Sequence, residues 1–251
     1  MPRDFTCQAL TLRVKVSGES NREAWFLTAE EGLLKATVYG GPKSRLRAYV
    51  APFHEGKLWI YHDPVRDSNK VSDFDVQSYR PGIREVWERA MAADAVAETI
   101  LSSQGGGENW PEALKLAGAV LDALNEAAAK ACPYIAVYFF WHWAHILGVR
   151  PDIFACASCS CEAKREDVLW YFARKEVLLC EKCSIGIKED TGSLLRVGCG
   201  ARLWLKEIES FPPATLERVT LDELSLEQAK ALSQAVLAAT LGRRLPTWNG
   251  I

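Results

Sequence analysis

Residues 24–39 read AWFLTAEEGLLKATVY, two apolar runs on either side of a short polar segment. The runs AWFLT (24–28) and LLKATVY (33–39) are rich in aromatic, β-branched and leucine residues, a composition typical of strands. The segment AEEG (29–32) between them has the length and the glycine of a tight turn. We therefore predict a β-hairpin in this stretch.

The segments around this hairpin also have strand patterns. From residue 10 to residue 16 apolar and polar residues alternate, as in a strand with one buried face. The apolar face is Leu10, Leu12, Val14 and Val16, and the opposite face is Thr11, Arg13 and Lys15. Further strands are predicted at residues 45–53, 56–62 and 72–79. Five or six short strands within about 80 residues indicate a small β-barrel or sandwich.

The sequence changes character at Pro81-Gly82, after which Ala, Leu and Glu become frequent. Helices are predicted at residues 83–103, 110–130, 134–148, 200–210 and 225–241. The predicted fold class is therefore α+β and multidomain. It has a β-domain at residues 1–80 and an α-helical domain at residues 81–251.

The predicted helix at residues 134–148 is apolar almost all round, which predicts a central place in the helical domain. It is short for a membrane span and carries His142 and His145, for which we expect a core role rather than metal binding. The N-terminal residues lack the apolar run of a signal peptide. We therefore expect a cytoplasmic protein with no membrane partner.

The clearest chemical signal is a pair of CxxC motifs. Cys156 and Cys159 form the first and Cys180 and Cys183 the second, with 20 residues between the pairs. Two such motifs supply the four thiolates of the tetrahedral shell that zinc prefers, and no position stays open for catalysis. We predict one structural Zn²⁺ in an insert at about residues 154–185. The alternatives are four free cysteines or a redox-active pair.

The second signal is the segment YGGPKSRLRAY (39–49), which places three cations within five residues of a chain with a net charge of −2. In a strand, the period of two would put all three on one face. Cations on the other predicted strands would extend that face. The candidate DNA-binding residues are Lys35, Lys43, Arg45, Arg47, Arg13 and Lys15.

Such a face attracts phosphates without sequence preference, and aromatic side chains supply stacking platforms for bases. The candidate platforms are Trp25, Tyr39, Tyr49 and Trp59. The alternative is an ordinary solvated strand face, which periodicity alone does not exclude.

Two separated regions carry a family resemblance. The first contains GES (18–20), FLTAEEGLLKATVYGG (26–41), PKSRLR (42–47) and APF (51–53). The second contains YFFWHWAHILGVRPDIFACASC (138–159) followed by LLCEKC (178–183). In these motifs and in their order the sequence resembles the RecO family, bacterial mediators of DNA repair and recombination.

The resemblance implies an N-terminal OB-fold and a helical C-terminal domain with a four-cysteine zinc site. It implies binding to single- and double-stranded DNA, annealing of complementary strands, and no enzymatic activity. It also implies partnership with RecR and with the C-terminal tail of single-stranded DNA-binding protein, and hence an indirect action on RecA loading. The implied location is cytoplasmic, at the nucleoid during repair.

Carried over by position, the metal matches are the four cysteines of the CxxC pairs, and the basic matches are Lys35, Lys43, Arg45 and Arg47. The sequence departs from the family pattern beside both motifs. Ser160 and Cys161 follow the first pair, where members often have Gly, and Lys175-Glu176 stands where a Gly-Gly pair is common. Cys161 is an alternative to Cys159 as a ligand.

Two rival functions remain open. A thiol–disulfide oxidoreductase would use one CxxC pair, although neither pair lies in a thioredoxin-like βαβ pattern. A zinc-stabilised adaptor would bind proteins but not DNA. Metal analysis separates the first rival from the mediator, and a salt-dependent DNA-binding assay separates the second.

Overall fold

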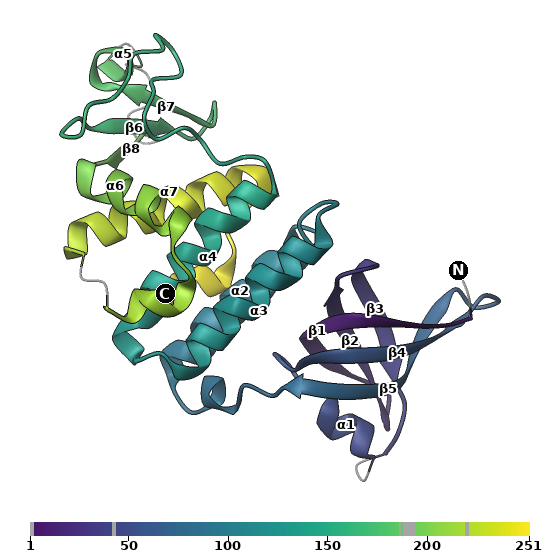
Figure 1. Cartoon of the computed structure of the whole chain (residues 1–251). Coiled ribbons are helices and arrows are strands. Elements are labelled where there is room, and N and C mark those ends of the chain that lie inside the picture. The colour runs from purple at the N-terminus through teal and green to yellow at the C-terminus, as the bar shows by residue number, and fades with distance from the viewer. Residues whose placement is uncertain (1–2, 42–43, 186, 188–193, 219–220) are drawn as a thin grey trace. The chain divides into compact units, whose positions relative to one another are not determined.

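The computed structural model describes residues 3–41, 44–185, 187, 194–218 and 221–251. These residues form two compact units, Met1–Glu126 and Ala127–Ile251. Figure 1 shows a strand barrel with two long helices in the first unit, and a group of helices with a small sheet in the second.

The first unit begins with a closed five-stranded barrel. Its strands follow the order β1-β2-β3-β5-β4 around the barrel. Their bounds are β1 (Asp4–Ser17), β2 (Asn21–Thr28), β3 (Gly32–Val38), β4 (Glu55–Asp63) and β5 (Ser68–Ser78). Neighbouring strands are antiparallel except β3 and β5, which pair in parallel and close the barrel. The predicted OB-type barrel is thus confirmed.

The predicted hairpin is formed by β2 and β3. The hydroxyl of Thr28 donates to the carbonyl of Gly32 at 2.9 Å and accepts from the amide of Glu31 at 3.0 Å. Gly32 has a φ of +65°, and a Cβ there would lie 2.5 Å from the Trp110 ring. Both the backbone conformation and the close approach therefore require glycine at the end of this turn.

The alternation predicted for residues 10–16 is wrong over part of β1. The pairing with β2 shifts between Thr11 and Arg13, where a β-bulge inserts one residue. Because a one-residue shift moves the following side chains to the other face, Val14 packs against the barrel core while Leu10, before the bulge, lies outside it; Val16, near the end of β1, is 73% exposed. Leu10 lies opposite Leu27, and both are buried outside the barrel core, on strands that contact the two long helices.

The strand predicted at residues 45–53 is also wrong, because Arg45–Tyr49 form the short helix α1. The barrel closes through β3, β5 and β4, so a further strand would have no partner. Leu46 and Tyr49, three residues apart, instead pack against the barrel core, and Val50 is fully buried. Arg45 and Arg47 therefore project from a helix and do not share one face with the period of two that a strand would give them.

Two helices complete the first unit. These are α2 (Trp87–Ser102) and α3 (Trp110–Glu126), close to the predicted positions. A short 3₁₀ turn at Pro81–Arg84 leads into α2, because proline suits the first turn of a helix. Both helices contact barrel strands.

Arg80 joins the barrel to α3. Its side chain is 3% exposed, and it donates to the carboxylate of Asp122 at 2.6 Å and to that of Glu55 at 2.6 Å. A third hydrogen bond, 2.9 Å long, goes to the carbonyl of Phe53. Arg80 itself has a φ of +47°, a left-handed conformation that turns the chain from β5 toward the helices.

The second unit is built around α4 (Cys132–Ile146), α6 (Cys199–Glu207) and α7 (Glu223–Leu241). Ten residues of α4 are buried on all sides of the helix, as its sequence predicts. Asp222 caps α7 by accepting from the Ser225 amide at 2.9 Å, and Gly242 ends it with a φ of +68°. Among the described residues, no helix combines the length and apolar character needed to cross a bilayer.

We predict that Arg80→Met destabilises the protein by about 3 kcal/mol, because it leaves two carboxylates without their buried cation. Urea unfolding followed by tryptophan fluorescence measures this change. The exposed Arg66 provides the control, and Arg66→Ala should change the free energy of unfolding by less than about 0.5 kcal/mol. Equal stability of the two variants would contradict the anchoring role of Arg80.

Candidate functional site

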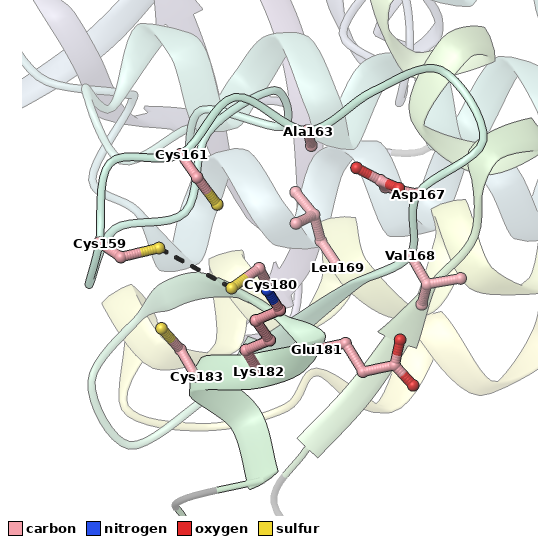
Figure 2. A pocket seen from close by; sticks show the side chains of 10 residues that line it. All are labelled: Cys159, Cys161, Ala163, Asp167, Val168, Leu169, Cys180, Glu181, Lys182 and Cys183. Atoms are coloured by element: carbon pink, nitrogen blue, oxygen red, sulfur yellow. Dashed lines mark hydrogen bonds between the residues drawn. The ribbon is translucent and has the colours of Figure 1, made fainter.

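The structure brings the four predicted ligands together. The sulfur atoms of Cys156, Cys159, Cys180 and Cys183 all lie within 4.8 Å of one another. The Sγ atoms of Cys159 and Cys180, joined by the dashed line in Figure 2, are 3.8 Å apart. Tetrahedral zinc with Zn–S bonds of about 2.3 Å separates its sulfurs by about 3.8 Å, so the four side chains fit such an ion.

Local backbone geometry explains how each pair converges. In the first knuckle the amide of Ser160 donates to the carbonyl of Cys156 at 2.8 Å, and Ser160 has a φ of +58°. The amide of Cys156 in turn donates to the carbonyl of Cys161 at 3.0 Å, which closes the loop. The second pair lies where β7 (Val177–Cys180) runs directly into α5 (Glu181–Ile185).

A three-stranded antiparallel sheet carries these knuckles. Its central strand β6 (Leu169–Phe172) pairs with β7 on one side and with β8 (Leu194–Val197) on the other. The apolar runs at residues 168–172 and 177–179 indicate a hairpin between the CxxC pairs, and β6 and β7 form it. β8 was not predicted from the sequence.

Backbone hydrogen bonds favour the thiolates of Cys156 and Cys159, whereas a side-chain hydrogen bond with Cys180 raises the pKa of Cys183 to about 12. Burial raises the pKa of Cys156, but backbone hydrogen bonds from Cys180, Cys159 and Ser158 outweigh it and lower the pKa to about 6. A backbone hydrogen bond from Cys161 likewise lowers the pKa of Cys159. Since metal ligands must be deprotonated, these donors prepare the site for a cation.

Arg202 attaches this sheet to the helices of the second unit. Its side chain is fully buried, and it donates to the carbonyls of Ile153 at 2.8 Å and of Asp167 at 2.5 Å. Further bonds reach the carbonyls of Ala163 and Lys164, so one guanidinium satisfies the loops on both sides of the knuckle. Sequence reasoning missed this residue, although a cation on the apolar face of α6 is a signal that can be searched for.

Three other cysteines and His142 lie outside this group of four sulfurs. Cys7 and Cys132 are buried and Cys199 is exposed, and within the described residues they do not join a metal-binding group. The Nε2 atom of His142 lies 3.1 Å from the carbonyl of Ile208, and burial lowers the pKa of its imidazole. His142 is thus a half-buried residue with a hydrogen-bonded ring, whereas His145 is exposed, so the core role predicted for it is wrong.

On the barrel, three of the predicted cations gather around Trp25. Strand register places Arg13, Trp25 and Lys35 in one row across β1, β2 and β3. Ala24 and Phe26 on either side of Trp25 belong to the core, so Trp25 lies on the outer surface. The ammonium of Lys35 is 5.2 Å and that of Lys15 is 5.7 Å from the Trp25 ring centre. Lys35 also pairs with Glu23 at 2.8 Å.

Two other predicted cations lie on α1. Arg45 donates to the hydroxyl of Tyr49 at 3.0 Å and lines a hollow of about 780 Å³ with Trp59. Asp73 and Asp75 line the same hollow, which makes its charge mixed. Lys43 lies outside the described residues.

Arg22 is a cation that the sequence did not single out. It donates to the carbonyl of Arg47 at 3.3 Å, and burial together with the nearby Arg47 charge lowers the pKa of its guanidinium. Arg22 pairs with Val16 of β1, one position from the pair Lys15 and Glu23. Arg22 has the strand parity of the core residues Ala24 and Phe26, so it lies on the inward face at the end of β2, beside α1, and not on the outer face that carries Trp25.

These observations define the class of the protein. It has an OB-type barrel with cationic and aromatic side chains on its outer surface, followed by a helical unit with a group of four cysteine thiols. The family model described as "Recombination protein O N terminal" matches residues 1–79, and that described as "Recombination protein O C terminal" matches residues 84–249. The chain belongs to the RecO family of DNA repair proteins.

Curated members of this family align with the chain over most of their length. The DNA repair protein RecO of Desulfitobacterium hafniense (strain DSM 10664 / DCB-2) is 25% identical over 260 residues, covering 98% of this chain and 88% of that protein. RecO of Bacillus subtilis (strain 168) is 26% identical, covering 76% and 75%. RecO of Synechococcus sp. (strain JA-3-3Ab) is 24% identical, covering 96% and 79%.

We predict that Cys156→Ser abolishes stoichiometric metal binding, because it removes a buried member of the four-thiol shell. Elemental analysis should find about one zinc per chain in the unmodified protein and almost none in the variant. Limited proteolysis should then cut the β6–β7 hairpin. The exposed Cys199 provides the control, and Cys199→Ser should keep its metal. Full metal content in Cys156→Ser would contradict the assignment.

Proposed function

We propose that this RecO family protein is a recombination mediator that binds single- and double-stranded DNA and anneals complementary strands. With RecR it would help RecA load onto strands coated by single-stranded DNA-binding protein. The observation that carries the DNA-binding part is the row of Arg13, Trp25 and Lys35, with Lys15 beside it, on the outer surface of the barrel.

This row combines the two contacts that single strands offer. Cations neutralise phosphates without reading sequence, and the Trp25 face provides a platform on which any base can stack. Because neither contact occupies the hydrogen-bonding edge of a base, a bound strand keeps that edge available for its complement. Annealing therefore requires no nucleotide hydrolysis, and we propose a mediator that is not an enzyme.

Arg22 and Arg47 form a second pair of cations for phosphates, beside α1. Their guanidiniums are close enough for their like charges to interact, and a phosphate between them would relieve that repulsion. The ring stacking sites near α1 are Tyr49 and Trp59, each with a cation over its ring.

We further propose that the four-cysteine centre holds one structural Zn²⁺. The ion would hold the two knuckles together and so stabilise the small sheet, whose cluster beside the cysteines has Cys156, Phe172 and Leu179 as its buried residues. Four thiolates would fill its coordination shell, which leaves a structural role.

We propose a binding site for the acidic tail of single-stranded DNA-binding protein on the basis of charge. A groove of about 400 Å³ runs beside α7, lined by Ala231, Ala235 and Ala238 and bordered by Arg243 and Arg244. An acidic peptide with an apolar end matches this groove, because its apolar end can contact the alanines and its carboxylates can contact the two arginines. A second apolar hollow, of about 300 Å³, is lined by Glu207 and Phe211 instead, and its carboxylate would repel such a tail.

The Trp25 row makes a direct prediction. Lys15→Ala/Lys35→Ala should weaken single-stranded DNA binding and reduce the salt slope by about 1.4, from the loss of two phosphate contacts. Trp25→Ala should weaken it by about 1–3 kcal/mol through lost stacking. Fluorescence anisotropy at several salt concentrations measures both.

Lys164→Ala/Arg165→Ala removes the same charge from exposed positions in the second unit and is the matched control. If binding is lost only in Arg45→Ala/Arg47→Ala, the DNA interface lies at α1 and not at the Trp25 row. Unchanged affinity and salt slope in every barrel variant would instead favour a zinc-stabilised adaptor without DNA activity.

For the tail, Arg243→Ala/Arg244→Ala should abolish saturable binding of a fluorescent acidic peptide whose last residues are apolar. Phe211→Ala in the other hollow is the control and should bind as the unmodified protein does. The reverse pattern, with binding lost only in Phe211→Ala, would contradict the groove assignment.

A further inference from the structure

A fifth cysteine lies beside the four-thiol centre. Cys161 is exposed and lines a hollow of about 480 Å³ together with Cys159, Cys180 and Cys183. Figure 2 shows its sulfur directed toward those of Cys159 and Cys180. It does not belong to the group of four sulfurs that lie within 4.8 Å of one another.

The backbone holds Cys161 in this position. Its carbonyl accepts from the amide of Cys156, and Ala155 and Glu162 form an isolated β-bridge across the base of the loop. Because Ser160 has a φ of +58°, the chain reverses between Cys159 and Cys161. The thiol of Cys161 is thereby turned into the hollow that Cys159 also lines.

Coordination chemistry limits what this thiol can do. Four thiolates complete the tetrahedral shell of zinc, so a fifth thiol stays outside the shell but next to a ligand. Access to these sulfurs differs, since Cys156 is 1% exposed whereas the ligand Cys159 and the neighbouring Cys161 are both exposed. An oxidant arriving from solvent therefore meets Cys159 with Cys161 already beside it.

We propose that Cys161 is a resolving cysteine that makes the metal centre reversibly sensitive to hydroperoxides. This inference rests on the metal centre proposed above. Oxidation links Cys161 to the ligand Cys159, and the metal leaves a shell that has lost one thiolate.

The reaction balances in two steps. The Cys159 thiolate attacks hydrogen peroxide, takes one oxygen to become a sulfenic acid, and a proton from solvent completes the water that leaves. The Cys161 thiol then attacks that sulfur, the S–S bond forms, and a second water leaves with the hydroxyl. Two thiols have lost two electrons to one peroxide. A thiol reductant restores both thiols, and the site can bind metal again.

The test uses the full, zinc-loaded chain with hydrogen peroxide and a chromogenic zinc chelator. In the unmodified protein, zinc release should accompany a disulfide between Cys159 and Cys161, mapped by tandem mass spectrometry. Dithiothreitol and fresh zinc should then restore the full metal content. Cys199→Ser, which removes an exposed thiol elsewhere, should behave identically.

Cys161→Ser and Cys161→Ala should bind zinc before oxidation but recover several-fold less of it after peroxide and reductant, because Cys159 continues to irreversible sulfinic acid. Full recovery in both variants, or a disulfide map in which Cys161 stays reduced while zinc has left, would overturn the proposal. Absence of zinc before any peroxide is added would instead count against the metal centre itself, so the two failures are distinguishable.

Discussion

The buried guanidinium of Arg80 is the constraint on which the first unit depends. It lies where the chain leaves β5, and it binds carboxylates from β4 and α3 as well as a main-chain carbonyl. A buried cation requires such partners, so the barrel and α3 cannot separate without leaving it uncompensated. The position of α3 in turn places Trp110 against Gly32 and so supports the hairpin that carries Trp25 and Lys35.

Arg202 has the corresponding position in the second unit. Among the described residues, the acceptors of its hydrogen bonds are main-chain carbonyls of loops that flank the first knuckle, and its guanidinium also lies over the Phe154 ring, so its main role is to order backbone. The sheet that carries the cysteines is small, and Arg202 with a metal ion would fix it from two sides. If the proposed oxidation of Cys159 releases the metal, Arg202 on α6 would still hold the loops at the base of the insert.

On the proposed DNA surface, the side chains that would bind DNA differ from those that stabilise the barrel. Trp25 and the cations around it occupy outward positions of strands whose inward positions form the core. Substitutions there should therefore change DNA affinity with little effect on folding. The ion pair of Lys35 with Glu23 is partly exposed and contributes little stability, so a phosphate can compete for Lys35 at small cost.

Local patterns in the sequence were enough for the barrel hairpin, the central helix and the four ligands of the metal centre. Each depends on spacing over a few residues, since a CxxC pair brings its thiols together and a turn with glycine reverses the chain wherever they occur.

The cationic surface was predicted in part, because Arg13, Lys15 and Lys35 meet only through strand register, and the bulge in β1 that sets this register is not visible in the alternation. The helical state of Arg45–Tyr49 and the partners of Arg22, Arg80 and Arg202 depended on barrel closure and packing between segments far apart in the chain. Those contacts are non-local, and no short-range pattern encodes them.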